Sequence, residues 1–187
     1  MNKVYIEAGA NDGIFQSRTL SLKDKDFGIL IEPHLETYNK CCENRQNYLC
    51  KVYNCALVSF DYNFDTIDLG LHEHTAMNSI LYKNLNTVSV KARTLQSILD
   101  ENNISIVENF FLDTEGYENE ILKGIDFNKT KFKNIEIECH ASIIGITVEE
   151  EINTHITFLN DFGYKLIKIL LNDGNPKLIL INAVGEV

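Results

Sequence analysis

Short apolar runs without polar alternation recur along the chain, and they restrict its fold more than any other feature. Lys3–Ala8 and Phe27–Ile31 are two such runs. Runs of this kind are typical of strands that are buried on both faces of a parallel sheet. Further strands are predicted at Tyr48–Val58, Phe64–Leu71, Thr87–Ala92, Asn109–Leu112, Asn134–Glu138, Tyr164–Leu171 and Leu178–Asn182.

Helical patterns separate these runs. Thr147 and Glu150 form a capping-box pattern for a helix over Val148–Phe162, whose apolar stripe includes His155. The acids Glu149–Glu151 fit the first turn of that helix, where the dipole favours negative charge. The alternation predicts an α/β fold with a doubly wound, mostly parallel sheet that ends in a C-terminal antiparallel hairpin. Other helices are predicted at His34–Gln46, Leu95–Asn102 and Tyr117–Lys123.

Composition narrows the class of protein. The chain has 187 residues, 44% of them hydrophobic, and no linker or repeat divides it, so we expect one domain over residues 1–187. No apolar run is long enough for a transmembrane segment, and Met1–Lys3 leads into the first strand without a leader pattern.

A net charge of −10 disfavours binding to nucleic acid. Five cysteines without C-x-x-C spacing indicate reduced thiols in a cytoplasmic protein and do not predict a zinc site.

The first predicted strand ends in the sequence E-A-G-A-N-D-G. Gly9 and Gly13 leave the backbone free to turn sharply and to approach a ligand closely. The spacing differs from G-x-G-x-x-G, and the carboxylates of Glu7 and Asp12 disfavour a pyrophosphate beside the turn. They suit a ligand that carries an ammonium and a sulfonium, so the turn predicts a site for S-adenosylmethionine.

The second predicted strand ends in an acid, Glu32. An acid about 20 residues after a glycine turn is the usual hydrogen-bond acceptor for ribose hydroxyls. The ends of these two strands together therefore predict a nucleoside-binding site.

Four segments carry a resemblance to a known family: EAGANDGIFQSRTL, ILIEP, NCALVS and FFLDTEGYENEILKGI. Together they resemble the FkbM family of S-adenosylmethionine-dependent methyltransferases. The most specific part is the D-x-E-G-x-E pattern, which begins at Asp113 and ends at Glu118. The resemblance implies a class I methyltransferase fold, Rossmann-like, and O-methylation, often of sugar or polyketide hydroxyls.

The resemblance also implies which residues hold the cofactor. Glu32 would bind the ribose, and the Asn54–Ala56 segment would lie near the adenine. The implied cofactor-binding set, beginning with the methionine end, is Glu7, Gly9, Ala10, Asn11, Asp12, Gly13, Glu32, Pro33, Ala56 and Asp113.

Two features depart from the family pattern. Ser17, Arg18 and Thr19 stand where the family often has S-N-T, so Arg18 either meets an anionic substrate group or faces solvent. Many relatives also carry an N-terminal extension before the first strand, which this sequence does not show. We therefore expect a partner subunit in a homodimer to complete the pocket.

Methyl transfer to a hydroxyl requires alignment with the sulfonium methyl and a group that accepts the hydroxyl proton. Asp113, Glu115 and His140 are the predicted catalytic residues because they follow two neighbouring core strands. Glu115 and Glu118 also fit acids at the N-terminus of a helix, a role that needs no chemistry.

The same strand ends offer ligands for a divalent metal. Asp113, Glu138 and His140, together with Glu115, present oxygen and imidazole donors suited to Mg²⁺ or Mn²⁺.

Three functions remain open. The first is an O-methyltransferase that acts on a hydroxyl of a sugar, a glycan or a related small molecule. The second is a non-catalytic S-adenosylmethionine-binding module that regulates a partner. The third, an NAD-dependent oxidoreductase, is disfavoured by the missing middle glycine. His72 and His74 fit an exposed loop better than a metal site, and Thr75–Ser79 fits a substrate-binding loop.

Overall fold

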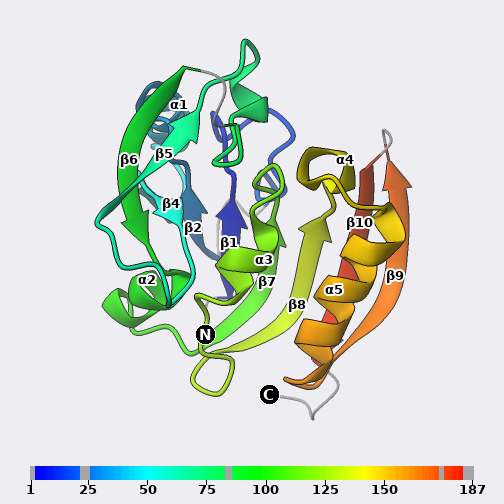
Figure 1. Ribbon diagram of the computed structural model, residues 1–187. Helices are drawn as coiled ribbons and strands as arrows, with labels where there is room; N and C mark the ends of the chain where they lie inside the picture. Colours follow the sequence, from blue (N-terminus) through cyan, green and yellow to red (C-terminus); the bar gives the residue numbers. More distant parts are fainter. Residues whose placement is uncertain (1–2, 22–25, 83–85, 173–174, 183–187) are drawn as a thin grey trace.

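The computed structural model describes residues 3–21, 26–82, 86–172 and 175–182 (Figure 1). A seven-stranded sheet forms its centre, in the order β3-β2-β1-β7-β8-β10-β9. The strands are β1 (Val4–Ala8), β2 (Phe27–Ile31), β3 (Cys50–Tyr53), β7 (Ile106–Leu112), β8 (Lys131–Glu138), β9 (Tyr164–Asn172) and β10 (Asn175–Asn182).

Five neighbouring strands, from β3 to β8, run parallel, whereas β10 pairs antiparallel with both β8 and β9. The chain moves outward from β1 to β2 and β3 and later returns to place β7 on the other side of β1. The strand order therefore reverses at β1, and ligands bind outside the carboxyl ends of the strands at such a point. The predicted doubly wound sheet with a closing hairpin is confirmed.

A second, three-stranded sheet lies beside the first, in the order β4-β6-β5. It consists of β4 (Ala56–Leu57), β6 (Thr87–Arg93) and β5 (Thr66–Gly70). The sequence predicts strands in these three regions but not that they form a sheet of their own. This small sheet packs its own apolar cluster of Ala56, Leu69 and Val90.

Helices cover the sheet on both faces, with α5 packed on β9 and α1 against β3 (Figure 1). The helices are α1 (Leu35–Asn44), α2 (Leu95–Glu101), α3 (Glu118–Leu122), α4 (Ala141–Ile144) and α5 (Val148–Asn160), with a short 3₁₀ helix at Thr75–Met77. The main core between the layers contains the fully buried side chains of Ile6, Phe110 and Ile135 from the central strands.

Helix α5 begins with the predicted capping box: the Thr147 side chain accepts from the backbone N–H of Glu150, and the Glu150 carboxylate accepts in return. The acids Glu149–Glu151 stand in the first turn, as predicted. Glu151 is the buried one of them: it is 1% exposed and lies on the buried face with His155 and Leu159. The spacing of four residues places these three side chains on one face of the helix, towards the sheet.

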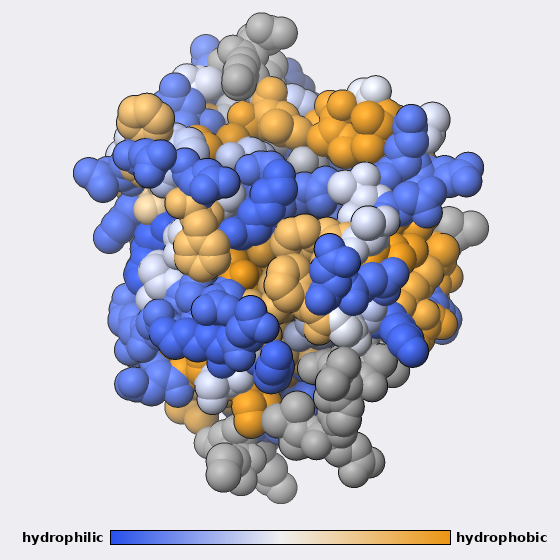
Figure 2. All heavy atoms as spheres, turned by 60° about the horizontal axis from the view of Figure 1, so that its bottom comes forward, coloured by the Kyte–Doolittle hydropathy of each residue, from blue (hydrophilic) through white to orange (hydrophobic). Residues whose placement is uncertain are grey.

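Hydrophilic side chains cover much of the end at which the parallel strands begin, with apolar patches between them (Figure 2). Among the described residues, no helix has the length and apolar character to cross a membrane. All five cysteines are free thiols, and Cys41, Cys55 and Cys139 are buried.

Candidate active site

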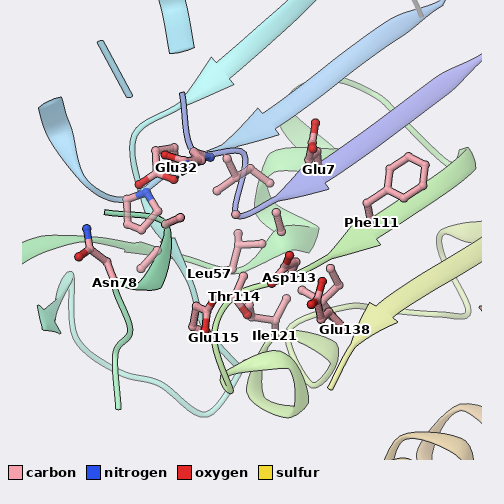
Figure 3. A pocket seen from close by; sticks show the side chains of 18 of the residues that line it. Glu7, Glu32, Leu57, Asn78, Phe111, Asp113, Thr114, Glu115, Ile121 and Glu138 are labelled. Carbon is pink, nitrogen blue, oxygen red and sulfur yellow. Dashed lines mark hydrogen bonds between the residues drawn. The ribbon is translucent and has the colours of Figure 1, made fainter. Parts of the chain in front are cut away.

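A cavity opens at the carboxyl ends of β1, β2, β7 and β8, where the strand order reverses. Figure 3 shows Glu7, Glu32, Asp113 and Glu138 around it, one from each of these strand ends or from the residue that follows. Residues of the small sheet close one side of the cavity, among them Leu57. The cavity therefore joins the two predicted halves of the site, the nucleoside side at β1 and β2 and the acidic side at β7 and β8.

The glycine turn after β1 is closed against both neighbouring strands. The backbone N–H groups of Gly9 and Ala10 donate to the Ile31 carbonyl, both at 3.0 Å. Gly9 has a φ of +86°, and a Cβ there would lie 1.8 Å from the backbone oxygen of Asp113. Only glycine fits this contact, so the turn brings the backbone of β1 directly against the start of the loop that follows β7.

Glu32 is held in place by backbone donors. Its Oε2 accepts from the N–H of Asn11 at 3.0 Å, and its Oε1 accepts from the N–H of His34 at 2.8 Å. Burial raises the pKa of Glu32 to about 7, although these two hydrogen bonds oppose the shift. The carboxylate is thus fixed in orientation at the edge of the cavity, and its charge changes near neutral pH.

Glu7 anchors the segment that follows the glycine turn. Its Oε1 accepts from the N–H of Arg18 at 2.8 Å, and its Oε2 accepts from the hydroxyls of Ser17 (2.8 Å) and Thr19 (2.5 Å). Arg45, which is 3% exposed, places Nη2 3.9 Å from this carboxylate and donates to the same two hydroxyls. Sequence reasoning missed Arg45, whose place in a helical pattern carries no functional signal.

The predicted cofactor residues divide into two groups by position. Asp12 does not line the cavity; its Oδ1 accepts from the N–H groups of Ile14 (2.9 Å) and Phe15 (2.7 Å) and so caps the turn. Ala10 and Gly13 also lie outside the lining. The predicted cofactor residues that do line the cavity are Glu7, Gly9, Asn11, Glu32, Pro33, Ala56 and Asp113.

Arg18 lines the cavity, and its side chain is at the same time 38% exposed to solvent. Its Nη2 is 2.5 Å from Glu136 Oε1, and its guanidinium lies 5.8 Å from the ring centre of Phe111. Beside this pair, Glu138 Oε2 lies 2.7 Å from Lys177 Nζ. The I-E-I-E alternation of β8 places Glu136 and Glu138 on one face, a signal that sequence reasoning used only for Glu138.

The loop after β7 is organised by Glu118. This side chain is 1% exposed, and its Oε1 accepts from the N–H groups of Thr114 (2.8 Å) and Gly116 (3.2 Å). Glu115 between them has a φ of +56°, a left-handed conformation that is strained for a side chain other than glycine. Glu118 is therefore an internal support of the D-x-E-G loop, more than an acid at the N-terminus of α3.

His140 is 2% exposed and lies among three carboxylates. Its Nε2 is 3.5 Å from Asp113 Oδ1 and 3.5 Å from Glu115 Oε2, and its Nδ1 is 3.4 Å from Glu118 Oε1. Burial by itself lowers the pKa of His140, but Glu118, Glu115 and Asp113 together raise it to about 9. The ring is then an imidazolium at neutral pH and the counter-ion of these acids.

Asp113 faces the cavity from the end of β7 (Figure 3). Burial, followed by repulsion from Glu138, raises the pKa of Asp113 well above its usual range, and His140 opposes the shift. Of the predicted metal ligands, Asp113 and His140 lie with Glu115 in a group whose donor atoms are all within 4.8 Å of one another. Glu138 is not part of that group.

The segment after β5 also reaches the cavity, through Thr75, Ala76 and Asn78. His72 and His74 lie in the same segment with their rings stacked, their centres 5.9 Å apart. Figure 3 shows Asn78 on the side of the cavity near Glu32.

A family model described as a methyltransferase FkbM domain matches residues 7–166. The chain belongs to the FkbM methyltransferase family. The match spans both strand ends with the glycine turn and Glu32, the D-x-E-G loop, and helix α5. This FkbM protein is an S-adenosylmethionine-dependent methyltransferase. No curated protein matches its sequence.

Several solved structures share the fold. A fibrillarin/Nop5p complex matches with a TM-score of 0.61 and 14% identity over 97% of this chain and 73% of that chain. The fibrillarin pre-rRNA processing protein of Methanococcus jannaschii matches with a TM-score of 0.57 and 14% identity, over 97% and 67%. M. capricolum TrmK in complex with S-adenosyl-homocysteine matches with a TM-score of 0.56 and 9% identity, over 98% of this chain and 63% of that chain. The predicted class I methyltransferase fold is confirmed.

Proposed function

We propose that this FkbM protein transfers a methyl group from S-adenosylmethionine to a hydroxyl of a sugar, a glycan or a related small molecule. The observation that carries the proposal is the single cavity in which Glu32 and Asp113 lie at opposite sides of the glycine turn. The first side chain suits a nucleoside, and the second suits removal of a proton. A non-catalytic cofactor-binding module has no use for the second group.

The cofactor is proposed to extend from β2 to β1. Glu32 accepts hydrogen bonds from the ribose hydroxyls, with Pro33 beside it. The adenine lies against the apolar wall formed by Ala56 and Leu57 of the small sheet, both of which line the cavity. The methionine end then lies along the glycine turn, where the net negative charge suits its ammonium and sulfonium groups.

The acceptor is proposed to lie over β7 and β8. Phe111 offers a ring face there, and the pairs Arg18–Glu136 and Lys177–Glu138 offer charged donors and acceptors around it. A polyhydroxylated ring presents apolar C–H faces and a rim of hydroxyls, which match such a surface. The net charge of −10 also supports an acceptor other than nucleic acid.

Asp113 is the proposed general base. Bound S-adenosylmethionine would supply the methyl group to the acceptor oxygen and, with its bond from sulfur to that carbon broken, would leave as S-adenosyl-homocysteine. The hydroxyl proton passes to the Asp113 carboxylate, and a base in this position contributes about 10²–10⁴-fold to the rate. His140 positions Asp113 and Glu115 because its Nε2 lies 3.5 Å from an oxygen of each.

A divalent ion, Mg²⁺ or Mn²⁺, is the alternative way to position the hydroxyl. Its ligands would be Asp113, Glu115 and His140, whose donor atoms lie within 4.8 Å of one another. Chelator treatment separates the two arrangements: turnover that persists in EDTA supports the imidazolium, and turnover restored only by Mg²⁺ or Mn²⁺ supports the ion.

Two measurements test the proposed function. Calorimetry of S-adenosylmethionine binding comes first, followed by methyl transfer from the labelled cofactor to a panel of sugars, glycans and polyketide alcohols, with RNA as a further acceptor. Asp113→Asn is expected to lower turnover by about 10²–10⁴-fold. Methylation of RNA alone would overturn the proposed acceptor class.

The proposed homodimer is tested separately, by light scattering on the same purified protein.

A further inference from the structure

A second cluster of ligand-type side chains lies behind the active site, in the interior of the protein. Cys139 follows directly after β8, and Glu151 and His155 stand one turn apart on the inner face of α5. Figure 1 shows α5 lying in front of the sheet beside the end of β8. These three side chains are 0%, 1% and 1% exposed, respectively.

The donor atoms of Cys139, Glu151 and His155 all lie within 4.8 Å of one another. In a tetrahedral zinc site, with bonds of about 2.0–2.3 Å, neighbouring donor atoms lie about 3.3–3.8 Å apart. Small rotations of the three side chains therefore close the cluster around an ion.

The cluster contains buried polar atoms that other described residues do not satisfy. Neither His155 Nδ1 nor His155 Nε2 has a hydrogen-bond partner among them, and Glu151 Oε2 has none either. The Glu151 Oε1 atom, at 3.7 Å from His155 Nε2, is too far for a hydrogen bond. An unsatisfied polar atom in the interior costs about 1–3 kcal/mol, so atoms of this kind call for an explanation.

We propose that Cys139, Glu151 and His155 bind a zinc ion. A thiolate, an imidazole and a carboxylate form a donor set that zinc takes in proteins, and it differs from the oxygen donors that Mg²⁺ requires. The ion bonds to the carboxylate and to one ring nitrogen, which gives a partner to Glu151 Oε2 and to one of the two unsatisfied nitrogens of His155. The charges also balance, because a thiolate and a carboxylate together neutralise Zn²⁺.

The ion would tie α5 to the end of the strand that leads into the active site. Glu151 Oε1 already accepts from the backbone N–H of His140 at 3.0 Å, and the N–H of Cys139 donates to the Pro176 carbonyl at 2.8 Å. Zinc bound by Glu151 then holds the backbone on which His140 stands. The site is structural, and it stands whether or not the proposed hydroxyl acceptor is right.

Metal analysis of the full chain, purified without a polyhistidine tag, is the first test. Elemental analysis is expected to find about one zinc ion per chain. After removal of zinc and reconstitution with Co²⁺, a thiolate-to-cobalt absorption band is expected in the near ultraviolet. That band distinguishes this cluster from Asp113, Glu115 and His140, which contain no sulfur.

Cys139→Ser and His155→Gln are expected to lower the zinc content at least about tenfold, because each variant removes one of three ligands. Cys41→Ser makes the same chemical change at another fully buried cysteine and is expected to retain the ion. Wild-type protein that takes up neither ion, cobalt that binds without the thiolate band, or Cys139→Ser that retains full zinc content would each overturn the assignment. The cobalt spectrum of the wild type decides the matter if a variant fails to fold.

Discussion

The charge of Glu32 makes it the sharpest probe of the cofactor site. Burial raises its pKa to about 7 from an ordinary 4.5, with the backbone N–H groups of His34 and Asn11 acting in the opposite direction. In the proposed cofactor site, the ionised carboxylate is the form that would accept hydrogen bonds from both ribose hydroxyls. We therefore expect the affinity for S-adenosylmethionine to fall about tenfold for each pH unit below 7 and to be constant above it.

Glu32→Gln removes the charge and keeps the shape. A hydrogen bond to a charged acceptor contributes about 1.5–3 kcal/mol, so loss of the charge at two ribose contacts is expected to weaken binding by about 10²-fold or more at pH 8. Glu36→Gln, on the exposed side of α1, is the matched control and is expected to bind as the wild type does. Calorimetry on the three proteins between about pH 6 and pH 8 gives the comparison.

The ionisation of Glu32 also affects the free energy of unfolding. The direction of this effect follows from the pKa of Glu32 in the folded and in the unfolded chain. In the unfolded chain the carboxyl ionises near 4.5, whereas in the folded protein it retains its proton to about 7. The contribution of Glu32 to stability is therefore fully present below about pH 4.5. It falls by up to about 3 kcal/mol as the pH rises to about 7 and is constant above that pH. Glu32→Gln is expected to lack that decline in urea unfolding. An affinity that does not change with pH in the wild type, together with normal binding by Glu32→Gln, would refute the assignment.

Three further changes test the architecture by thermal or urea unfolding. Gly9→Ala places a Cβ against a backbone oxygen and is expected to destabilise by about 3 kcal/mol or more, whereas Gly145→Ala, which has open space around it, is expected to cost only about 1 kcal/mol. Equal losses would contradict this account of the turn. Glu118→Gln leaves buried donors without a charged acceptor and is expected to cost about 2–4 kcal/mol, against under about 1 kcal/mol for Glu120→Gln. Thr147→Ala removes the α5 capping box and is expected to cost about 1 kcal/mol, and no loss would show that the box contributes nothing.

Features that depend on neighbouring residues were predictable from the sequence. Gly9 indicates a tight turn, and Thr147 with Glu150 indicates the start of α5. Glu32 follows a buried strand at the expected distance from the turn. Each is a short-range pattern with one favourable backbone solution, so the residue types alone indicate it.

The partners of individual side chains in distant segments were not predictable. Arg45 reaches the hydroxyls of Ser17 and Thr19 across more than 25 positions, and Glu151 turns inward because α5 packs on the sheet. An acid in the first turn of a helix and an arginine at the end of another read as ordinary surface residues. Only tertiary packing gives them partners, and propensity carries no information about it.

Helix α1 shows the same limit on a smaller scale. Its first residue, Leu35, is 60% exposed, while Thr37 and Cys41 face the sheet. The apolar pattern of the sequence favours a different face, with Leu35, Tyr38 and Cys42. The glycine turn packs against Cys41 instead, at Gly13.

The contact of Gly9 with the Asp113 backbone distinguishes two parts of the cavity lining: the turns that are joined to each other and the segments that are not. The glycine turn and the loop after β7 are joined there, and the Asp113 N–H also donates to the Ala8 carbonyl at 3.1 Å, so neither can be reshaped without disturbing the other. Phe15, in the loop after β1, and Ala76, in the short 3₁₀ helix after β5, also line this cavity. Attempts to redirect this enzyme to a new acceptor should therefore change those two segments, because the joined turns form a fixed frame for the proposed cofactor site.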